Sequence, residues 1–273
     1  MYFSHDIADY PEGIVLPVDK PYRWTSADVI RKLKFAAIKH FGKKNLKVGH
    51  AGTLDPLATG VLLVCIGDAC KRAQELQNHD KEYIARIRFG ATTPSYDLEK
   101  EVDRTFPYGH ITADAVRAAL PAFLGEQEQV APLFSAKSVD GVRAYELARK
   151  LYRSGRSAEL DSAALDTLQR NRIVISELEL LDFAAAGSTL SPESVATSTA
   201  SSRIHVADTS ALGLPEAVIR IACSKGTYIR AFARDLGEAL GSGAHLSGLV
   251  RSRSGDFCLE NALTLDQALD LLQ

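Results

Sequence analysis

Gly49-His-Ala-Gly-Thr-Leu-Asp-Pro-Leu-Ala-Thr-Gly60 is the stretch of this sequence that decides the fold. Residues 47–56 show neither helical nor strand periodicity and hold two glycines and a proline, so we predict a loop there. Pro56 restricts the backbone of Asp55 to extended conformations and stiffens it. Such a carboxylate could be a nucleophile or a general base, or it could cap the next segment as a turn residue. The glycine spacing is not that of a phosphate-binding loop.

The elements around this loop are predicted from hydrophobic patterning. A helix with a basic outer face precedes the loop, and Ser26 is predicted as its N-cap. Strands and helices alternate without a regular βαβ rhythm, which indicates an α+β fold with a mixed, mostly antiparallel central sheet. Strands are predicted at residues 13–19, 61–66, 83–89, 130–139, 171–183, 217–223 and 254–259, and helices at 69–78, 112–123, 143–153, 227–240 and 264–272.

The length of 273 residues allows one large domain or two modest ones, and we predict a single domain over residues 1–273. Residues 184–213 are small, polar and aperiodic, so we interpret them as a flexible surface insertion. The four cysteines form no CxxC motif, and Cys65 and Cys223 lie in apolar runs. Free thiols of this kind fit a cytoplasmic protein without a cysteine-bound metal.

The N-terminus has neither the basic nor the apolar region of a signal peptide, and the longest apolar runs are too short to span a bilayer. The net charge of −2 disfavours nucleic-acid binding when it is taken over the whole chain. The distribution of charge favours it, because Lys20 to His50 contains nine Lys/Arg against the single acid Asp28. Charge alone leaves open whether this stretch is a phosphate-binding face or a solvated helix surface.

The quoted stretch resembles the signature motif of the TruB family of pseudouridine synthases, and the resemblance continues in order along nearly the whole chain. It implies the pseudouridine synthase fold. The other matching segments are Asp19-Lys-Pro-Tyr-Arg-Trp-Thr-Ser26, Lys81-Glu-Tyr-Ile-Ala85, Ser135-Ala-Lys-Ser-Val-Asp-Gly-Val-Arg-Ala-Tyr-Glu-Leu-Ala-Arg149, Lys225-Gly-Thr-Tyr-Ile-Arg230, Arg234-Asp-Leu-Gly237, Ala244-His-Leu246 and Leu249-Val-Arg-Ser-Arg-Ser-Gly255.

The resemblance implies that Asp55 is the essential aspartate, which acts at the sugar as nucleophile or base. It implies that Arg230 is the ion-pair partner of Asp55, an arrangement that would keep a buried carboxylate ionised. Without the motif, Arg230 and Arg234 read as two residues of an exposed helix face. Tyr83 is implied to stack on the flipped base, whereas by pattern alone it is a half-buried sheet aromatic.

Further substrate-binding residues are implied in the same way. Tyr228 and Leu249 would be pocket walls, although a core position is a rival for Leu249. His50 would enter the space left by the extruded nucleotide, with a structural hydrogen bond in the loop as its rival. The remaining matches are Lys20 and Lys71, which would support the pocket or contact phosphate, and Asp97, in the RNA-contacting loop.

The substrate implied by the resemblance is the T arm of tRNA, in which uridine 55 of the T loop would be isomerised. Such a reaction involves no net redox change and no external donor, so no cofactor and no metal are expected. The base must leave its stack, and phosphate contacts would compensate that cost. We expect a monomer with no membrane association.

Three departures from the family pattern bear on these expectations. Arg23 stands where the family has a glycine, and it either adds a phosphate contact or alters the turn. Lys137 precedes Ser138 where an apolar residue and then lysine are usual, and Lys100 replaces a common glycine. The chain stops soon after the closing motif, so we expect no C-terminal RNA-binding domain of the PUA kind and a greater reliance on the core.

Other functional classes remain as alternatives. The main one is a non-catalytic RNA-binding or tRNA-folding protein on the same scaffold, which the presence of Asp55, Tyr83 and Arg230 disfavours. A guide-RNA-dependent enzyme of the same superfamily is disfavoured by the short C-terminal region. A sugar hydrolase with a lone carboxylate is the remotest alternative, because no motif places a second acid.

Overall fold

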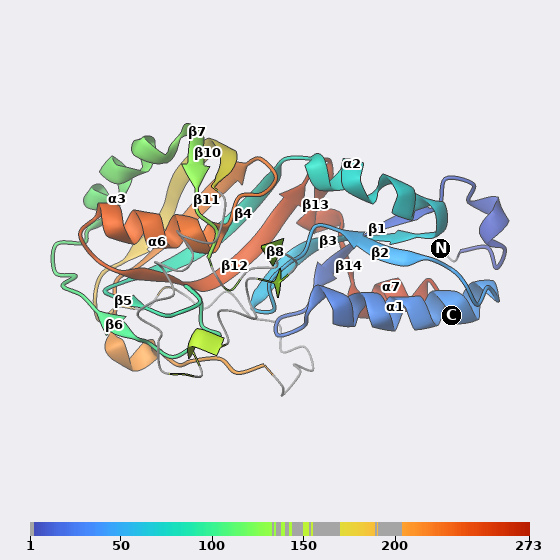
Figure 1. Cartoon of the computed structure of the whole chain (residues 1–273), viewed down its shortest axis with the longest axis horizontal. Coiled ribbons are helices and arrows are strands. Elements are labelled where there is room, and N and C mark those ends of the chain that lie inside the picture. The colour runs from blue at the N-terminus through green and yellow to red at the C-terminus, as the bar shows by residue number, and fades with distance from the viewer. Residues whose placement is uncertain are drawn as a thin grey trace. The chain divides into compact units, whose positions relative to one another are not determined.

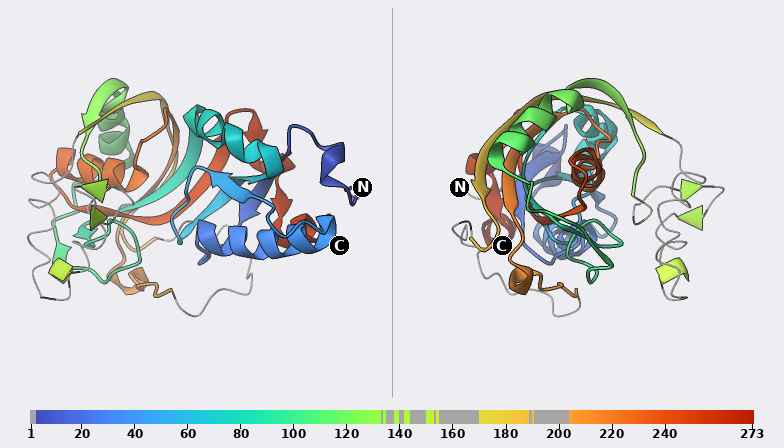
Figure 2. Two further views of the ribbon diagram at one scale, coloured as in Figure 1. Left: turned by 45° about the vertical axis from the view of Figure 1, so that its right-hand side comes forward. Right: turned by 90° about the vertical axis from the view of Figure 1, so that its left-hand side faces the viewer.

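A computed structural model describes residues 3–132, 134, 138–139, 142–143, 150–152, 154, 170–188, 190 and 204–273 (Figure 1; Figure 2). The chain divides into two compact units. Unit 1 comprises Met1–Tyr83, Ser194–Ile204 and Val250–Gln273, and unit 2 comprises Ile84–Glu193 and His205–Leu249. The expectation of a single domain stays a prediction.

The main sheet has ten strands among the described residues, and its path runs β14-β1-β3-β12-β4-β11-β10-β7, with β13 on β12 and β2 on β3. β1 pairs with β14 in parallel, and the other pairings given by residue are antiparallel. The strands are β1 (Ile14–Lys20), β2 (Val48–Ala51), β3 (Ala58–Ile66), β4 (Lys81–Phe89), β7 (Gly125–Gln129), β10 (Asn171–Ala184), β11 (Glu216–Cys223), β12 (Ala244–Ser254), β13 (Phe257–Cys258) and β14 (Leu263–Thr264).

Two small ribbons, β5 (Ala91–Thr92) with β6 (Arg104–Thr105) and β8 (Ser138–Val139) with β9 (Val142–Arg143), stand apart from the main sheet. The helices are α1 (Ser26–Phe41), α2 (Ala73–Asn78), α3 (Ala113–Ala119), α6 (Ile229–Ala239) and α7 (Leu265–Asp270). Each helix in the described part of the chain falls short of the length and apolarity that a membrane crossing requires. The α+β class with a mixed, mostly antiparallel sheet is confirmed.

In unit 1, β3 provides the centre of the core. Its residues 61–66 are fully buried, which explains the unbroken apolar run in the sequence. α1 buries Val29, Leu33 and Ala37 on one side at helical spacing. A capping box between Thr25 and Asp28 begins the helix and is worth about 1 kcal/mol.

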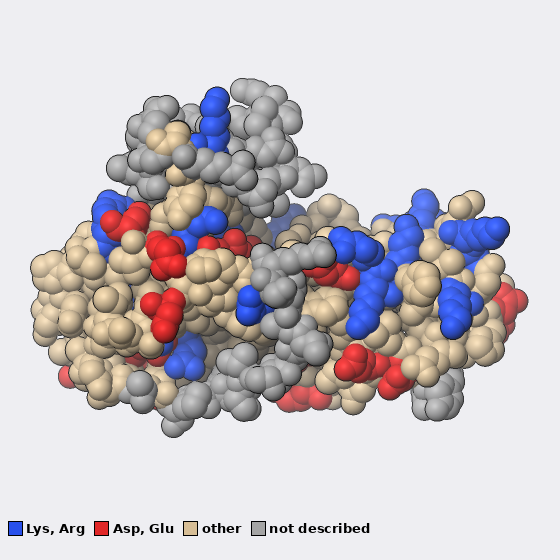
Figure 3. Space-filling model, turned by 90° about the horizontal axis from the view of Figure 1, so that it is seen from below, with Lys and Arg blue, Asp and Glu red and all other residues tan. Residues whose placement is uncertain are grey.

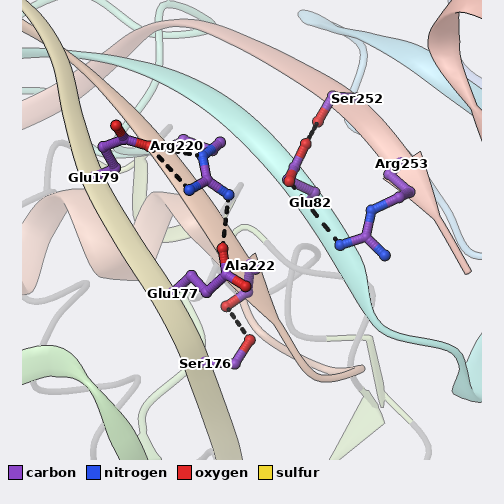
Figure 4. A network of polar contacts seen from close by, with 8 residues as sticks. All are labelled: Glu82, Ser176, Glu177, Glu179, Arg220, Ala222, Ser252 and Arg253. Carbon is purple, nitrogen blue, oxygen red and sulfur yellow. Dashed lines mark hydrogen bonds and ion pairs between the residues drawn. The ribbon is translucent and has the colours of Figure 1, made fainter.

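In unit 2, β10 and β11 form the longest pairing given by residue, and α6 buries a face that includes Phe232, Ala233 and Leu236. The Arg220 side chain on β11 reaches across to Glu177 and Glu179 on β10, at 2.8 Å and 2.9 Å (Figure 4). Cross-strand ion pairs of this exposed kind contribute little stability individually but favour one register.

The structure corrects two predictions near the start of the chain. The N-cap of α1 is Thr25 rather than Ser26, because the Thr25 side chain accepts from the N–H of Asp28 and leaves the Ser26 hydroxyl for another partner. The predicted loop 47–56 contains strand β2, which is ordered by pairing with β3 rather than by its own periodicity.

The structure also corrects the strand assignments later in the chain. Of the strand predicted at 130–139, Ser138–Val139 form β8, and residues 133 and 135–137 lie outside the described residues. The strand that joins the main sheet in this region is β7 at Gly125–Gln129, where pairing with β10 overrides a polar sequence. β12 occupies Ala244–Ser254, whereas the sequence predicted only a strand near 254–259. Most of the predicted helix 143–153 and of the segment Ser135–Arg149 lies outside the described residues, as do residues 189 and 191–203 of the predicted insertion 184–213.

Candidate active site

The turn that carries Asp55 lies in unit 1 and connects two paired strands, β2 and β3. Asp55 is partly exposed, whereas Leu54 and Leu57 on either side are buried at 4% and 9% exposure. The N–H of Ala58 donates to the carbonyl oxygen of Asp55 at 3.1 Å. The two leucines anchor the turn in the core, so the position of the aspartate backbone is fixed.

Ser26, in the first turn of α1, ties that helix to the Asp55 turn. Its Oγ donates to the carbonyl oxygen of Leu54 at 3.1 Å and accepts from the N–H of Leu54 at 2.9 Å. Both bonds are buried, so water does not compete for them. The helix that precedes the loop therefore positions the residue next to Asp55.

Lys20, at the end of β1, lies behind the same turn and is fully buried. Its Nζ donates to the carbonyl oxygens of Pro21, Trp24 and Pro56, at 3.0, 2.6 and 3.2 Å. Burial lowers the pKa of Lys20 to about 7, although the negative charges of Asp55 and Asp19 act in the opposite direction. The ammonium thus holds the backbone on the C-terminal side of Asp55.

Arg251, on β12, holds the N-terminal side of the turn. Its guanidinium donates to the carbonyl oxygens of Gly52 at 3.1 Å, Thr53 at 3.5 Å and Val61 at 2.7 Å. Arg251 is 1% exposed, so a buried cation is compensated here by main-chain oxygens. Arg251 thus places a positive charge at the turn that presents Asp55, and Lys20 adds a second one when its amine is protonated.

The other predicted residues of unit 1 lie on different elements. His50 is on β2, and burial together with the positive charge of Arg251 lowers its pKa, which favours the neutral imidazole. Tyr83 is on the buried face of β4, at 9% exposure. Lys71 is exposed and pairs with Asp68 at 2.9 Å. The substrate contacts of these three residues stay predictions.

Arg230 lies in unit 2, in the first turn of α6, and is 6% exposed. Its guanidinium donates to the carbonyl oxygens of Ser95 at 3.3 Å and Phe134 at 3.0 Å, and lies 3.7 Å from Asp97 Oδ2. The alternative interpretation, an exposed helix face with Arg230 and Arg234, is wrong because both side chains are largely buried.

Asp97 is itself buried at 5% exposure. Its Oδ1 accepts from Ser95 Oγ at 2.6 Å and from the N–H of Glu99 at 2.9 Å. The loop therefore presents an ordered carboxylate and a carbonyl oxygen to the Arg230 guanidinium. Direct contact of Asp97 with RNA stays a prediction, as does the ion pair of Arg230 with Asp55.

The remaining predicted residues also lie in unit 2. Tyr228 is the N-cap of α6, and Gln129 fixes its backbone by accepting from the Tyr228 N–H at 2.8 Å and donating to its carbonyl oxygen at 3.2 Å. Leu249, on β12, is partly exposed. Arg234 pairs with the neighbouring Asp235 at 2.7 Å.

Within the part of the chain that the structure describes, no cluster of His, Cys, Asp and Glu side chains is suited to bind a metal ion. The chemistry available at the Asp55 turn is that of a carboxylate next to buried cations. Such a carboxylate can stabilise positive charge that develops on a substrate, or attack it.

Comparison with known proteins extends these observations. The family model "TruB family pseudouridylate synthase (N terminal domain)" matches residues 39–191, and "tRNA pseudouridylate synthase B C-terminal domain" matches residues 230–273. The chain is 48% identical to tRNA pseudouridine synthase B of Phocaeicola vulgatus, with 94% of this chain and 92% of that protein covered. It is 38% identical to the protein of the same name from Deinococcus radiodurans, with 92% and 77% covered.

The chain belongs to the TruB family. Among solved structures, it is similar to a chain of the "Crystal Structure of a Cbf5-Nop10-Gar1 Complex", with a TM-score of 0.61, 24% identity and 97% of this chain covered. It spans 56% of that longer chain. A chain from "Structure of H/ACA RNP bound to a substrate RNA containing 2'-deoxyuridine" gives a TM-score of 0.58 at 23% identity. This likeness shows a shared fold, the pseudouridine synthase fold.

One departure from the TruB family pattern is explained by the backbone. Arg23 adopts a left-handed conformation with φ 62°, so the turn keeps the geometry that glycine permits. Its Nη2 donates to the carbonyl oxygen of Ile204 at 2.5 Å. The arginine therefore preserves the turn and directs its side chain to a main-chain oxygen of unit 1.

Sequence reasoning missed two residues that order the Asp55 turn. Ser26 was interpreted only as an N-cap, and Arg251 was quoted in the closing motif without a role. The signal for Arg251 was an arginine in the TruB closing motif, within an otherwise small and polar segment. No local signal joined Ser26 to Leu54, because the contact spans 28 positions.

Proposed function

We propose that this chain is a tRNA pseudouridine synthase that isomerises uridine 55 in the T loop of tRNA. Support comes from the relatives named tRNA pseudouridine synthase B, of which the first covers 94% of this chain. The observation that carries the proposal is the Asp55 turn, where Lys20, Ser26 and Arg251 hold the backbone on both sides of a partly exposed aspartate.

The reaction is an isomerisation that balances within the substrate. The C1′–N1 bond of uridine breaks and a C1′–C5 bond forms. The proton on C5 leaves and N1 takes up a proton, so there is no net oxidation or reduction. The Asp55 carboxylate acts at the ribose, where positive character develops as the base departs.

The surrounding residues are assigned to the steps that the substrate requires. Arg230 pairs with Asp55 and keeps the carboxylate ionised when RNA excludes water. Tyr83 stacks on the flipped base, and Tyr228 and Leu249 form pocket walls. His50 enters the space left by the nucleotide, a role that suits a neutral imidazole because a desolvated cation would be costly there.

The RNA partner in this proposal is the T-arm stem-loop, recognised largely by shape. The exposed basic residues between Arg31 and Lys47 would supply phosphate contacts, assisted by Lys71, while Asp97 supports the loop at the RNA face. The proposed enzyme works as a monomer in the cytoplasm and without a cofactor. Unstacking the uridine costs a few kcal/mol, which those contacts offset.

The decisive experiment incubates unmodified tRNA transcript with the wild-type and Asp55→Asn proteins and maps pseudouridine. Wild type should convert uridine 55, whereas Asp55→Asn should give no product because the amide carries no charge. Asp114→Asn is the matched control, since Asp114 is exposed and contacts Arg117 on the surface of α3. Its activity should equal that of wild type.

Two results would overturn the proposal. Product from Asp55→Asn would remove the carboxylate from the chemistry. Tight tRNA binding by wild type without product on any T arm would instead support the alternative, a non-catalytic RNA-binding protein on the same scaffold.

A further inference from the structure

A pocket along α1 in unit 1 is lined by none of the residues of the Asp55 turn. It has a volume of about 520 Å³ and is lined by Trp24, Asp28, Arg31, Lys32 and Phe35. Arg31 and Lys32 each lie three or four positions from both Asp28 and Phe35, so the four helical residues form one stripe along α1. Lys39 continues the stripe at the next turn.

The two aromatic side chains of this pocket are exposed to solvent to different extents. Phe35 is 76% exposed, the largest value among the large hydrophobic side chains that the structure describes. Trp24 is partly exposed at the start of the helix. An exposed phenylalanine beside a tryptophan is an apolar surface that water solvates poorly, and it gains free energy when a flat group covers it.

The positive charge around the pocket favours a flat group that is attached to negative charge. The Lys32 ammonium lies 5.4 Å from the centre of the Trp24 ring, and Arg31 is exposed. Asp28 is occupied, because one carboxylate oxygen contacts Arg31 at 2.9 Å and the other serves the capping box with Thr25. Two cations against one engaged acid leave a net positive surface next to the aromatic rings.

The pocket lies on a larger basic face of α1. Lys and Arg side chains gather on the part of the surface that α1 occupies (Figure 3). Four exposed Lys/Arg lie on α1 itself, and Lys43, Lys44 and Lys47 follow it in the next loop, against the one acid Asp28. A face of this sign attracts a polyanion, and the aromatic pocket within it accepts a base.

We propose that this pocket binds an unpaired nucleotide of the RNA substrate other than the isomerised uridine. The base stacks on Phe35 and Trp24, and the flanking phosphates meet Arg31 and Lys32. Proteins that hold single-stranded RNA combine the same two features, a basic track and aromatic platforms. The inference rests on the proposed function only for the choice of RNA as polyanion.

The only tryptophan in the sequence gives a direct readout, because Trp24 is itself in the pocket. The Asp55→Asn protein is titrated with oligouridylate and the tryptophan emission is followed, with free tryptophan amide as the correction for absorption. Stacking should quench the emission. An abasic oligonucleotide of the same charge should leave it unchanged. Equal quenching by both, or by neither, overturns the proposal.

Substitution separates stacking from charge. Phe35→Ala should weaken oligouridylate binding roughly 5- to 100-fold, because base–aromatic stacking is worth about 1–3 kcal/mol and tenfold corresponds to about 1.4 kcal/mol. Leu181→Ala is the control, since Leu181 is also exposed, at 46%, but lies on β10. Equal binding by wild type and Phe35→Ala contradicts the proposal.

Lys32→Ala should reduce the slope of log K for oligouridylate binding against log salt concentration by about one, which corresponds to the loss of one phosphate contact. Lys34→Ala is matched in charge but lies off the stripe, so it should change that slope less. Equal changes of the slope in both variants would indicate a general electrostatic attraction of the helix for RNA and would contradict the assignment of the pocket as a binding site.

A tRNA assay distinguishes failure of this inference from failure of the proposed function. Phe35→Ala should raise KM for tRNA and leave kcat at saturation unchanged, since Phe35 has no part in the chemistry. Pseudouridine formation with unchanged KM would overturn the pocket alone. Quenching of Trp24 by oligouridylate without any pseudouridine formation would overturn the proposed function alone.

Discussion

The Asp55 turn in unit 1 and the Arg230 site in unit 2 hold opposite charges, and they are built in opposite ways. At the turn, the carboxylate is partly exposed while the cations Lys20 and Arg251 are buried behind it and bond main-chain oxygens. At the helix start, the guanidinium is buried and Asp97 lies beside it. In the first arrangement the hydrogen bonds hold the backbone of the turn in place. In the second they orient the side chain of Arg230.

We infer from this difference that the contacts at the Asp55 turn control the stability of unit 1, whereas those at the Arg230 site control turnover. Removing a cation behind the turn should change the stability of unit 1, since several carbonyl oxygens lose their donor at once. Changing the shape of the Arg230 cation should alter turnover first, because its contacts set the direction of a charged group.

The largest effect is expected from Arg251→Met. The buried carbonyl oxygens of Gly52, Thr53 and Val61 lose their donor, so the free energy of unfolding should fall by about 3 kcal/mol. Urea unfolding monitored by circular dichroism measures this. Arg253→Met is the control, because the Arg253 side chain is 39% exposed and lies 4.0 Å from Glu82. A loss no greater than that of the control would mean that the carbonyl contacts contribute little.

Arg230→Lys tests the other side of the comparison. One ammonium cannot reach the oxygens of Ser95, Phe134 and Asp97 as a planar guanidinium does, so kcat should fall about 100-fold while the Kd for tRNA changes little. Single-turnover kinetics and filter binding give the two numbers. Arg234→Lys serves as control, and equal losses of binding and turnover in Arg230→Lys would argue against the orienting role.

Lys20 should make the free energy of unfolding depend on pH. Its folded pKa of about 7 lies below the ordinary value of 10.5, so between these values the unfolded chain binds a proton that the folded chain does not. The free energy of unfolding should therefore rise with pH across this window, by at most about 1.4 kcal/mol per pH unit. The slope is measured as the difference between wild type and Lys20→Met. A difference that stays flat from pH 7 to 10 would contradict the lowered pKa.

Ser26→Ala should give the smallest effect. The loss of the paired bonds to Leu54 should cost about 1 kcal/mol of stability and loosen the residue next to Asp55. Ser252→Ala removes a hydroxyl whose bond goes to Glu82 at 2.7 Å, away from the turn (Figure 4). If the two variants keep the same kcat, the bond from α1 has no influence on the carboxylate.

The sequence predicted the elements that carry a strong local pattern. The strand at 217–223 was found within one residue of β11 because its apolar run is bounded by polar segments. β12 was missed because Ala244–Ser254 is rich in small and polar residues. Those residues find partners far along the chain, such as Glu216 for Ser247, and no local pattern contains them.

The candidate site was predictable to the same extent. The proline, the glycines and the family resemblance were enough to single out Asp55. The contacts that order it join Ser26 with Leu54 and Arg251 with Gly52, across 28 and 199 positions. Such contacts depend on how β12 and α1 pack in unit 1, which short-range periodicity does not encode.

Gly60 shows how narrow the tolerance of this arrangement is. A Cβ atom at position 60 would lie 2.3 Å from the carbonyl oxygen of Arg251, and its φ of +97° is one that side chains rarely adopt. A single methyl group would act as a wedge between β3 and the main chain that bears the arginine. Position 60 therefore requires glycine, because the Arg251 guanidinium reaches Gly52 and Val61 only while no side-chain atom is present at residue 60.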